Sequence, residues 1–349
     1  MNRAQVLATI DPAPVLDTRG RPLRDLRVSV IETCNFRCPY CMPAEATPEE
    51  SALDRSRRLD FDQIETAVRA FVRNGVRKVR LTGGEPLLRK DLPTLVRRLA
   101  RIEGIEDLAL TTNGSLLAGK ASALRDAGLR RLTISLDALD PDLFRRLSGG
   151  RGELSQVLAG IAAAEAAGFD SIKFNAVIQR GLNEDQVLPL VQRFRGSRHV
   201  LRFIEFMDVG SCNGWRPEAV LESRSLRDRV HARWPLRPLQ PSYRGEVAQR
   251  HAFVDGQGEI GFVSSVSAPF CGDCHRARLS ADGRLYTCLF ASAGADLRES
   301  IGQGEDALAA RIAELWGRRA DRYSEQRGAA AAEPTTRPSR KIEMFYIGG

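Results

Sequence analysis

Long hydrophobic runs are lacking in this sequence. No stretch of the 349 residues approaches the roughly 20 apolar residues that a membrane span requires. Residues 1–15 contain no extended apolar segment like that of a secretory signal. We therefore expect neither a membrane protein nor an exported one, and we expect a cytoplasmic location. Internal repeats are also not apparent, and the length allows one large domain, alone or with an appendage.

A strong excess of charge of either sign is lacking too. Lys plus Arg less Asp plus Glu gives 52 − 44 = +8, and charged residues make up 28% of the chain against 43% hydrophobic residues. This balance is typical of a globular protein. The excess permits a nucleic-acid partner but does not require one, and a small anionic ligand would suit it equally. We expect no nucleic-acid and no membrane partner.

Cysteines are few, but six of the seven fall into two groups of three. The first group is Cys34, Cys38 and Cys41 (C-x3-C-x2-C), and the second is Cys271, Cys274 and Cys288 (C-x2-C-x13-C). In a reducing compartment, clustered cysteines bind metal more often than they form disulfides. A structural zinc site takes four ligands, and the first group has no nearby fourth. A 4Fe-4S cluster normally takes four thiolates, so three would leave one iron open to a substrate.

Other interpretations of the cysteines remain open. The second group could be a zinc site completed by His275, and a C-x2-C pair can also serve as a redox dithiol. The two groups could share one site, although nothing in the sequence favours this. Cys212 is most simply a small buried or surface residue.

Short strand-like runs alternate with helical runs from residue 25 to about 207, which predicts repeated βα units and a parallel sheet. The predicted strands are 26–31, 77–82, 106–111, 131–136, 171–178 and 200–206. The predicted helices are 60–74, 91–102, 116–127, 153–167 and 184–195. Gly75, Gly128 and Gly168 each follow a helical run and are typical helix stops.

Several of these strands alternate polar and apolar residues. In KVRLT, for example, Lys78, Arg80 and Thr82 alternate with Val79 and Leu81, so each set lies on one face. A closed eight-stranded barrel fills its interior with bulky apolar side chains. A polar face therefore predicts an open, partial (β/α)6 barrel of the TIM type that holds a polar ligand. The intervening helices disfavour the alternative, an antiparallel sheet with one wet face.

Five short motifs follow or end predicted strands, and in such barrels the strand C-termini form the active face. They are CNFRCPYC, TGGEP (82–86), TTNG (111–114), Ser135 with Asp137, and Met207 with Asp208. We therefore expect one site at this face.

The pattern changes after residue 208. A predicted helix at 217–232 precedes short strands around 246–266, the second cysteine group and a helix near 298–318. We predict an α+β region that covers the barrel opening. The expected division is an N-terminal extension (1–24), the partial barrel (25–210), the C-terminal region (211–327), a flexible linker (328–340) and a tail ending in Gly-Gly (341–349).

The motif CNFRCPYC resembles the cluster-binding signature of the radical S-adenosylmethionine (SAM) superfamily. LTGGEPLLRKDL, TTNG, SLDALD, RFIEFMDVG, PFCGDCHRARLSADGRLYTCLF and the terminal GG together resemble the GTP 3′,8-cyclase family of molybdenum cofactor biosynthesis. The match covers roughly residues 22–300 and the tail. The C-x3-C-x2-C spacing identifies only the superfamily, whereas the second cysteine group and the final GG are specific to the cyclases. The sequence departs from the family pattern in IET (31–33) and at His275, where Asn is frequent.

The resemblance implies two 4Fe-4S clusters and SAM as cofactors. The first cysteine group would hold the cluster whose open iron binds the amino and carboxylate groups of SAM and reduces it to methionine and a 5′-deoxyadenosyl radical. The second group would hold a cluster that binds the guanine base. The residues that match the family's SAM contacts are Tyr40, Gly84, Ser135, Arg202 and Met207.

The resemblance also implies GTP as the substrate, and clustered cations suit a triphosphate. The radical would take hydrogen from the 3′ carbon of the ribose, and the new carbon radical would attack carbon 8 of guanine. The implied GTP residues are Arg27, Arg80, Thr111, Lys173, Arg276, Ala277 and Arg278, and Gly348 and Gly349 are implied to have a catalytic role. A reducing electron donor, a downstream pyranopterin monophosphate synthase and a homodimer are implied as well.

Two rival functions remain. Another twin-cluster radical SAM enzyme, such as a peptide maturase, would share the first cysteine group but would usually carry more C-terminal cysteines. A zinc-stapled nucleic-acid binder would use the net charge of +8 but gives no reason for TGGEP or for the polar strand faces.

Overall fold

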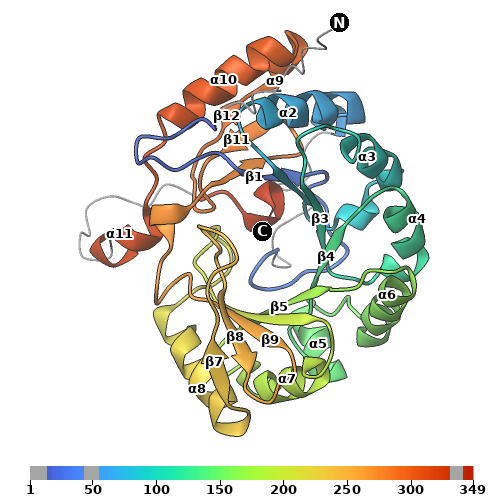
Figure 1. The fold of residues 1–349 in the computed structure, drawn as a ribbon, viewed down its shortest axis with the longest axis vertical. Helices are drawn as coiled ribbons and strands as arrows, with labels where there is room; N and C mark the ends of the chain where they lie inside the picture. The colour runs from blue at the N-terminus through green and yellow to red at the C-terminus, as the bar shows by residue number, and fades with distance from the viewer. Residues whose placement is uncertain (1–13, 43–54, 331–340, 349) are drawn as a thin grey trace, which may run out of the picture.

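The computed structural model describes residues 14–42, 55–330 and 341–348. Its strands form one curved sheet in the order β12-β11-β10-β1-β2-β3-β4-β5-β6-β9-β8-β7, with helices on the outside (Figure 1). Strands β1 to β6 pair in parallel and in chain order. They are β1 (Asp25–Ser29), β2 (Lys78–Thr82), β3 (Asp107–Thr112), β4 (Arg131–Ser135), β5 (Lys173–Ile178) and β6 (Val200–Glu205). Because β12 and β7 end the order as two separate edges, the sheet is not closed, and the predicted partial barrel is confirmed.

The outer helices also lie close to their predicted places. They are α2 (Phe61–Arg73), α3 (Leu92–Leu99), α4 (Ala121–Asp126), α6 (Leu154–Ala166) and α7 (Val187–Phe194). Helix α5 (Pro141–Leu147) was not predicted, although its start is marked in the sequence. The Asp140 carboxylate accepts a hydrogen bond from the backbone N–H of Leu143 at 2.7 Å, and Pro141 occupies the first helical position.

Apolar residues that recur along the helices hold this layer against the sheet. In α2, Ile64, Ala67, Val68 and Phe71 are buried at helical spacing and share one core with Val28 of β1. Gly75, Gly128 and Gly168 have φ angles of +102°, +102° and +82°, so the predicted helix stops are confirmed.

The C-terminal region extends the sheet at both edges, which was not predicted. Strand β9 (Glu259–Val263) pairs in parallel with β6, and β10 (Arg276–Leu279) pairs in parallel with β1. Antiparallel strands follow on each side, and the whole region folds with the barrel. They are β7 (Leu236–Pro238), β8 (Gln249–Phe253), β11 (Arg284–Tyr286) and β12 (Ala295–Asp296).

The remaining helices differ in part from the prediction. Helix α8 covers Ser223–Arg233, and the helix expected at 298–318 is divided into α9 (Arg298–Gly302) and α10 (Glu305–Gly317). The break lies at Gly304, whose φ of +99° is incompatible with a continuous helix. Helix α11 (Tyr323–Ala330) occupies the first three residues of the expected linker 328–340, and residues 331–340 lie outside the described part of the chain. A short helix, α12 (Met344–Ile347), ends the described tail. None of the helices described has the length and apolar character of a membrane span.

A buried ionic network joins the N-terminal segment to the C-terminal region. Asp17 Oδ2 lies 2.6 Å from Arg21 Nε and 3.1 Å from Arg319 Nη1. The two guanidinium groups also donate to the backbone carbonyls of Cys271 and Cys274, at 2.8 and 2.7 Å. Asp17 therefore bridges two buried cations that position the loop carrying the second cysteine group, and Asp321 pairs with the second of them at 3.3 Å.

We predict that Asp17→Ala destabilises the protein by about 3–5 kcal/mol, because it leaves buried guanidinium charge without its carboxylate. The free energy of unfolding in denaturant should reveal this loss. The matched control is Asp170→Ala, since Asp170 pairs with Arg198 through side chains that are 81% and 63% exposed. Equal stability of the two variants would contradict the assigned role of Asp17.

Candidate active site

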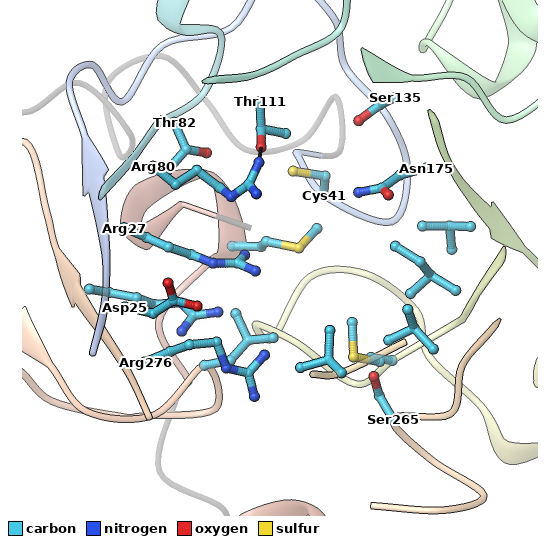
Figure 2. Close-up of a pocket in the computed structure, with 18 of the residues that line it drawn as sticks. Asp25, Arg27, Cys41, Arg80, Thr82, Thr111, Ser135, Asn175, Ser265 and Arg276 are labelled. Carbon is cyan, nitrogen blue, oxygen red and sulfur yellow. Dashed lines mark hydrogen bonds between the residues drawn. The ribbon is translucent and has the colours of Figure 1, made fainter. Parts of the chain in front are cut away.

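The polar face of the barrel strands and the C-terminal region line one cavity (Figure 2). All six cysteines of the two groups line it, which are Cys34, Cys38, Cys41, Cys271, Cys274 and Cys288. Figure 2 shows Arg27, Arg80 and Arg276 projecting into it from one wall, with Ser135 and Asn175 on another. Motifs that are up to 254 residues apart, from Cys34 to Cys288, therefore meet at one site.

The first cysteine group lies on the loop after β1. Cys34 Sγ accepts hydrogen bonds from the backbone N–H of Phe36 at 3.4 Å and from Asn113 Nδ2 at 3.9 Å. Cys38 O accepts from the N–H groups of Cys41 and Met42, which folds the loop into a turn. Burial raises the pKa of Cys34 to about 11 and raises the pKa values of Cys38 and Cys41 as well. Burial thus favours the neutral thiols, whereas the N–H donors at Cys34 sulfur would stabilise a thiolate bound to an iron–sulfur cluster.

The second cysteine group is more electropositive. Cys274 Sγ accepts a hydrogen bond from Arg276 Nη2 at 3.2 Å, and Cys288 Sγ accepts one from Phe290 N at 3.5 Å. Burial works to raise the pKa of Cys274, but the guanidinium groups of Arg276 and Arg319 outweigh it and lower this pKa to about 6. Cys274 is therefore preorganised as a thiolate, the form that binds metal. The donors at this end of the cavity also fit a cluster.

His275 is turned toward oxygen atoms. Its Nδ1 lies 3.1 Å from the carbonyl oxygen of Asp273, and its Nε2 lies 3.5 Å from Asp25 Oδ2. Among the residues described, no three His, Cys, Asp or Glu side chains are grouped as ligands of a single metal ion. Cys212 is exposed.

The residues predicted to contact SAM line the same cavity as the first cysteine group. They are Tyr40, Gly84, Ser135, Arg202 and Met207. A Cβ on Gly84 would lie 2.2 Å from the carbonyl oxygen of Thr33, so the chain after β2 approaches the cysteine loop as only glycine allows.

Asp137, beside this loop, was expected at the active face but was given no role as a site residue. Tyr40 Oη donates to Asp137 Oδ2 at 2.6 Å, and Val177 N donates to Asp137 Oδ1 at 2.8 Å. Burial raises the pKa of Asp137 to about 6, against the opposing effect of the Tyr40 hydrogen bond. Asp137 also lines the cavity and fixes the Tyr40 ring next to Cys41. Its place directly after a strand was the signal in the sequence.

The opposite wall of the cavity carries an excess of buried cations. Arg80 Nη1 donates to the hydroxyls of Thr111 and Thr133 at 3.0 Å each, which are neutral partners. Burial, followed by the neighbouring cations Arg278 and Arg80, lowers the pKa of Arg27 well below its usual value. Burial and then Arg276 lower the pKa of Arg278 to about 10. The Nε atoms of Arg276 and Arg278 have no hydrogen-bond partner in the part of the chain described.

Two residues predicted for GTP do not line the cavity. Lys173 begins β5 on the polar face, where burial and then Arg202 lower its pKa to about 8. Ala277 is 0% exposed in the apolar core, between the two arginines that face the cavity. The period of two along β10 already places Ala277 on the opposite face from Arg276 and Arg278.

Several further cavity residues were not predicted as site residues. Lys78 Nζ donates to Tyr243 Oη at 3.3 Å, and both side chains line the cavity together with Asp25 and Arg319. The alternation in β2 could have identified Lys78. Nothing in the local sequence marks Tyr243 or Arg319, because they reach the cavity from the C-terminal region through tertiary contacts.

The C-terminal tail lies inside the ring of strands, as the red segment in Figure 1 shows. Phe345 and Ile347 are 4% and 0% exposed, so this apolar segment of the tail is packed against the rest of the protein. Met344 lines the cavity. A Cβ on Gly348, which has a φ of +75°, would lie 2.2 Å from Cγ2 of the cavity residue Thr82. Gly349 lies outside the described residues.

The chain resembles known proteins over nearly its whole length. Residues 28–194 match the family model of the radical SAM superfamily, and residues 199–325 match that of molybdenum cofactor synthesis C. It is 68% identical over 344 residues to the GTP 3′,8-cyclase of Xanthomonas campestris pv. campestris (strain B100), covering 99% of this chain and 100% of that protein. The chain belongs to the GTP 3′,8-cyclase family. A cyclase of Acidothermus cellulolyticus is 51% identical, covering 96% of this chain and 99% of that protein.

Solved structures support the fold of this GTP 3′,8-cyclase family member. Streptococcus suis SuiB bound to S-adenosylmethionine has a TM-score of 0.55 at 17% identity, and SuiB bound to precursor peptide SuiA has 0.57 at 15%. The aligned parts cover 77% and 78% of this chain but 60% and 61% of those chains. At this identity the likeness shows a radical SAM fold and no more.

We predict that Arg278→Ala weakens GTP binding by about 1–3 kcal/mol, because a charge-assisted contact to the triphosphate is lost. Calorimetry on anaerobically prepared protein would measure this change. Arg276→Ala should weaken binding similarly, but it also removes the hydrogen bond to Cys274, so iron content must be measured in parallel. Arg198→Ala, at a side chain that is 63% exposed, is the matched control. Unchanged GTP affinity in both cavity variants would refute the assignment.

Proposed function

We propose that this chain converts GTP to (8S)-3′,8-cyclo-7,8-dihydroguanosine 5′-triphosphate as a radical SAM enzyme, in the first step of molybdenum cofactor biosynthesis. The observation that carries this function is that two cysteine triplets and a cluster of buried and half-buried arginines line the same cavity. The triplets suit two clusters with an open iron each, and the arginines suit a triphosphate. The family to which the chain belongs has this activity in its name.

We assign a different cluster to each cysteine triplet. Cys34, Cys38 and Cys41 would hold the cluster that, when bound, supplies the electron for cleavage of SAM to methionine and a 5′-deoxyadenosyl radical. Cys271, Cys274 and Cys288 would hold the cluster that binds guanine. Burial and the hydrogen bonds to the cysteine sulfur atoms would tune the reduction potential of each cluster.

The cavity residues would hold SAM at one end and GTP at the other. The proposed SAM contacts are Tyr40, Gly84, Ser135, Arg202 and Met207. The proposed GTP contacts that line the cavity are Arg27, Arg80, Thr111, Arg276 and Arg278. Lys173 and Ala277 stay proposals on the resemblance alone, with Ala277 restricted to its backbone because its side chain is in the core.

The bonds that change require two electrons. The first electron is used to cleave SAM. The resulting 5′-deoxyadenosyl radical takes a hydrogen atom from the ribose 3′ carbon and becomes 5′-deoxyadenosine. The 3′ carbon then bonds to carbon 8 of guanine, and a second electron with a proton completes the dihydro product. The chain's task is positioning, because the 3′ carbon must be held between the radical and the base. The proposed SAM and GTP contacts line the same cavity, which allows this placement.

The partners follow from that chemistry. We propose an external reducing donor for both electrons and a pyranopterin monophosphate synthase as the consumer of the product. We also propose a cytoplasmic location and a homodimer, which rest on the resemblance and on the composition. The cavity itself accounts for much of the buried positive charge, so nucleic acid is not needed to explain the net charge of +8.

We predict that the two cysteine groups have separable roles. Protein purified without oxygen should contain iron and sulfide rather than zinc. Cys38→Ala should abolish reductive SAM cleavage, because the first cluster loses a ligand, whereas Cys274→Ala should keep SAM cleavage and lose GTP turnover. Quantifying 5′-deoxyadenosine and cyclised product would separate the two effects. Equal loss of SAM cleavage in both variants, with the first cluster intact, would count against this division.

We predict that deletion of Gly348 and Gly349 sharply lowers the cyclised product. Gly348 already packs against Thr82 at a distance that admits no side chain, so the tail end completes a crowded part of the site. Iron content and GTP affinity should hardly change, because neither the cysteines nor the arginines depend on these glycines. Product analysis under reducing, anaerobic conditions is the measurement. Full turnover by the truncated enzyme would sink this assignment.

A further inference from the structure

Asp208 lies directly after β6 and behind the cavity wall. The preceding residue, Met207, lines the cavity, and the Asp208 side chain is turned away from it into a cluster of donors. Asp208 Oδ2 accepts from Tyr323 Oη at 2.5 Å and from Lys341 Nζ at 2.7 Å, and Asp208 Oδ1 accepts from Arg327 Nε at 2.9 Å. One carboxylate, 8% exposed, therefore meets two cations and a hydroxyl.

Two of the partners of Asp208 reach other parts of the cavity wall. Arg327 Nη1 donates to the carbonyl oxygen of Ser265 at 3.1 Å, and Ser265 lines the cavity. The Tyr323 ring stacks on Phe290 at a centroid distance of 4.6 Å. Phe290 lines the cavity, and its N–H donates to Cys288 Sγ. The carboxylate thus joins the end of β6 to the loop of the second cysteine group.

Lys341 connects the same carboxylate to the tail. Its Nζ also donates to the backbone carbonyl of Asp208 at 2.8 Å and lies 4.5 Å from the Tyr323 ring centroid. The tail is held further by Glu343, whose carboxylate accepts from Ser211 N at 2.8 Å. Gly210 has a φ of +76°, which favours glycine, and a Cβ there would lie 2.1 Å from Glu343 Oε2, so a larger residue would require the Glu343 carboxylate to move. Residues 341 and 343 therefore fasten the tail to the loop after β6.

We infer that Asp208 and Lys341 form an anchor that positions the C-terminal tail over the cavity, and that radical transfer to GTP depends on this anchor. The inference rests on the proposed function. Met344 of the tail lines the cavity three residues beyond Lys341. Gly348, at the end of the described tail, packs against Thr82, which also lines the cavity. The side chains of Lys341 and Asp208 are 18% and 11% exposed, so salt and water screen this ion pair less than a pair on the surface. Both are positioning residues, because neither lines the cavity itself.

The test uses Lys341→Met, which removes the charge but keeps an unbranched side chain beside Tyr323. Hydrogen exchange of residues 341–348 should become faster, because the tail loses its ionic contact. The rate of cyclised product should fall about 10- to 100-fold, the range for a misplaced reacting group. Iron content, GTP affinity and 5′-deoxyadenosine formation should stay within about twofold of the unchanged protein, because the variant leaves both ligand sets in place. Lys341→Arg should restore most of the product, and Lys120→Ala, which touches none of these residues, is the matched control.

A second variant keeps the test independent of Lys341 alone. Asp208→Asn should uncouple product from 5′-deoxyadenosine in the same way. Combining it with Lys341→Met should cost less than the sum of the two single losses, because the variants share the contact between Asp208 and Lys341, while Asp208→Asn also weakens the contacts to Tyr323 and Arg327. Unchanged exchange of the tail in Lys341→Met would overturn the anchor. Faster exchange with a normal product rate, or an equal fall in 5′-deoxyadenosine, would overturn its role in radical transfer. If the unchanged protein makes no cyclised product, the proposed function fails, while hydrogen exchange still decides whether the anchor exists.

Discussion

The parallel pairing of β10 with β1 is the contact on which the site depends. In this register Arg27 lies opposite Arg278 and Asp25 lies opposite Arg276. The pairing brings the second cysteine group, which precedes and follows β10, next to the strand whose loop carries the first. A closed barrel would exclude β10, because β1 would pair with the last strand instead. The open edge of the sheet is therefore what allows two cysteine triplets to share one cavity.

The positive charge of the cavity is carried by arginines on strands whose backbone is held in place by hydrogen bonds. Arg27, Arg80 and Arg278 project from strands that are hydrogen-bonded on both sides, so the points from which their side chains extend are fixed by the sheet. Their shifted pKa values reflect burial first and mutual repulsion second. Placing catalytic or binding groups on rigid strands gives them a defined geometry at the expense of intrinsic stability.

The sequence predicted the barrel well because period-two alternation and helix-ending glycines are local signals. It also singled out the six cysteines that line the cavity, because they fall into two groups along the chain, and their assignment to two clusters stays a prediction. It did not predict β10, although the alternation in RARL is itself strand-like, because four residues between cysteines were interpreted only as ligand-binding residues. The link between Asp17 and Arg319 joins residues 302 positions apart, and no local pattern encodes it. Ala277 shows a different limit, because the family motif includes a residue whose side chain lies in the core, so only its backbone is left as a proposed contact.

The unpartnered Nε atoms of Arg276 and Arg278 have a consequence for the protein as a folded molecule. A cavity in which buried cations face one another is a source of strain until an anion enters. A ligand that binds only the folded chain raises its stability in proportion to the logarithm of the ligand concentration. GTP bound in the cavity would therefore protect the folded chain against unfolding, and with it against proteolysis of the unfolded form.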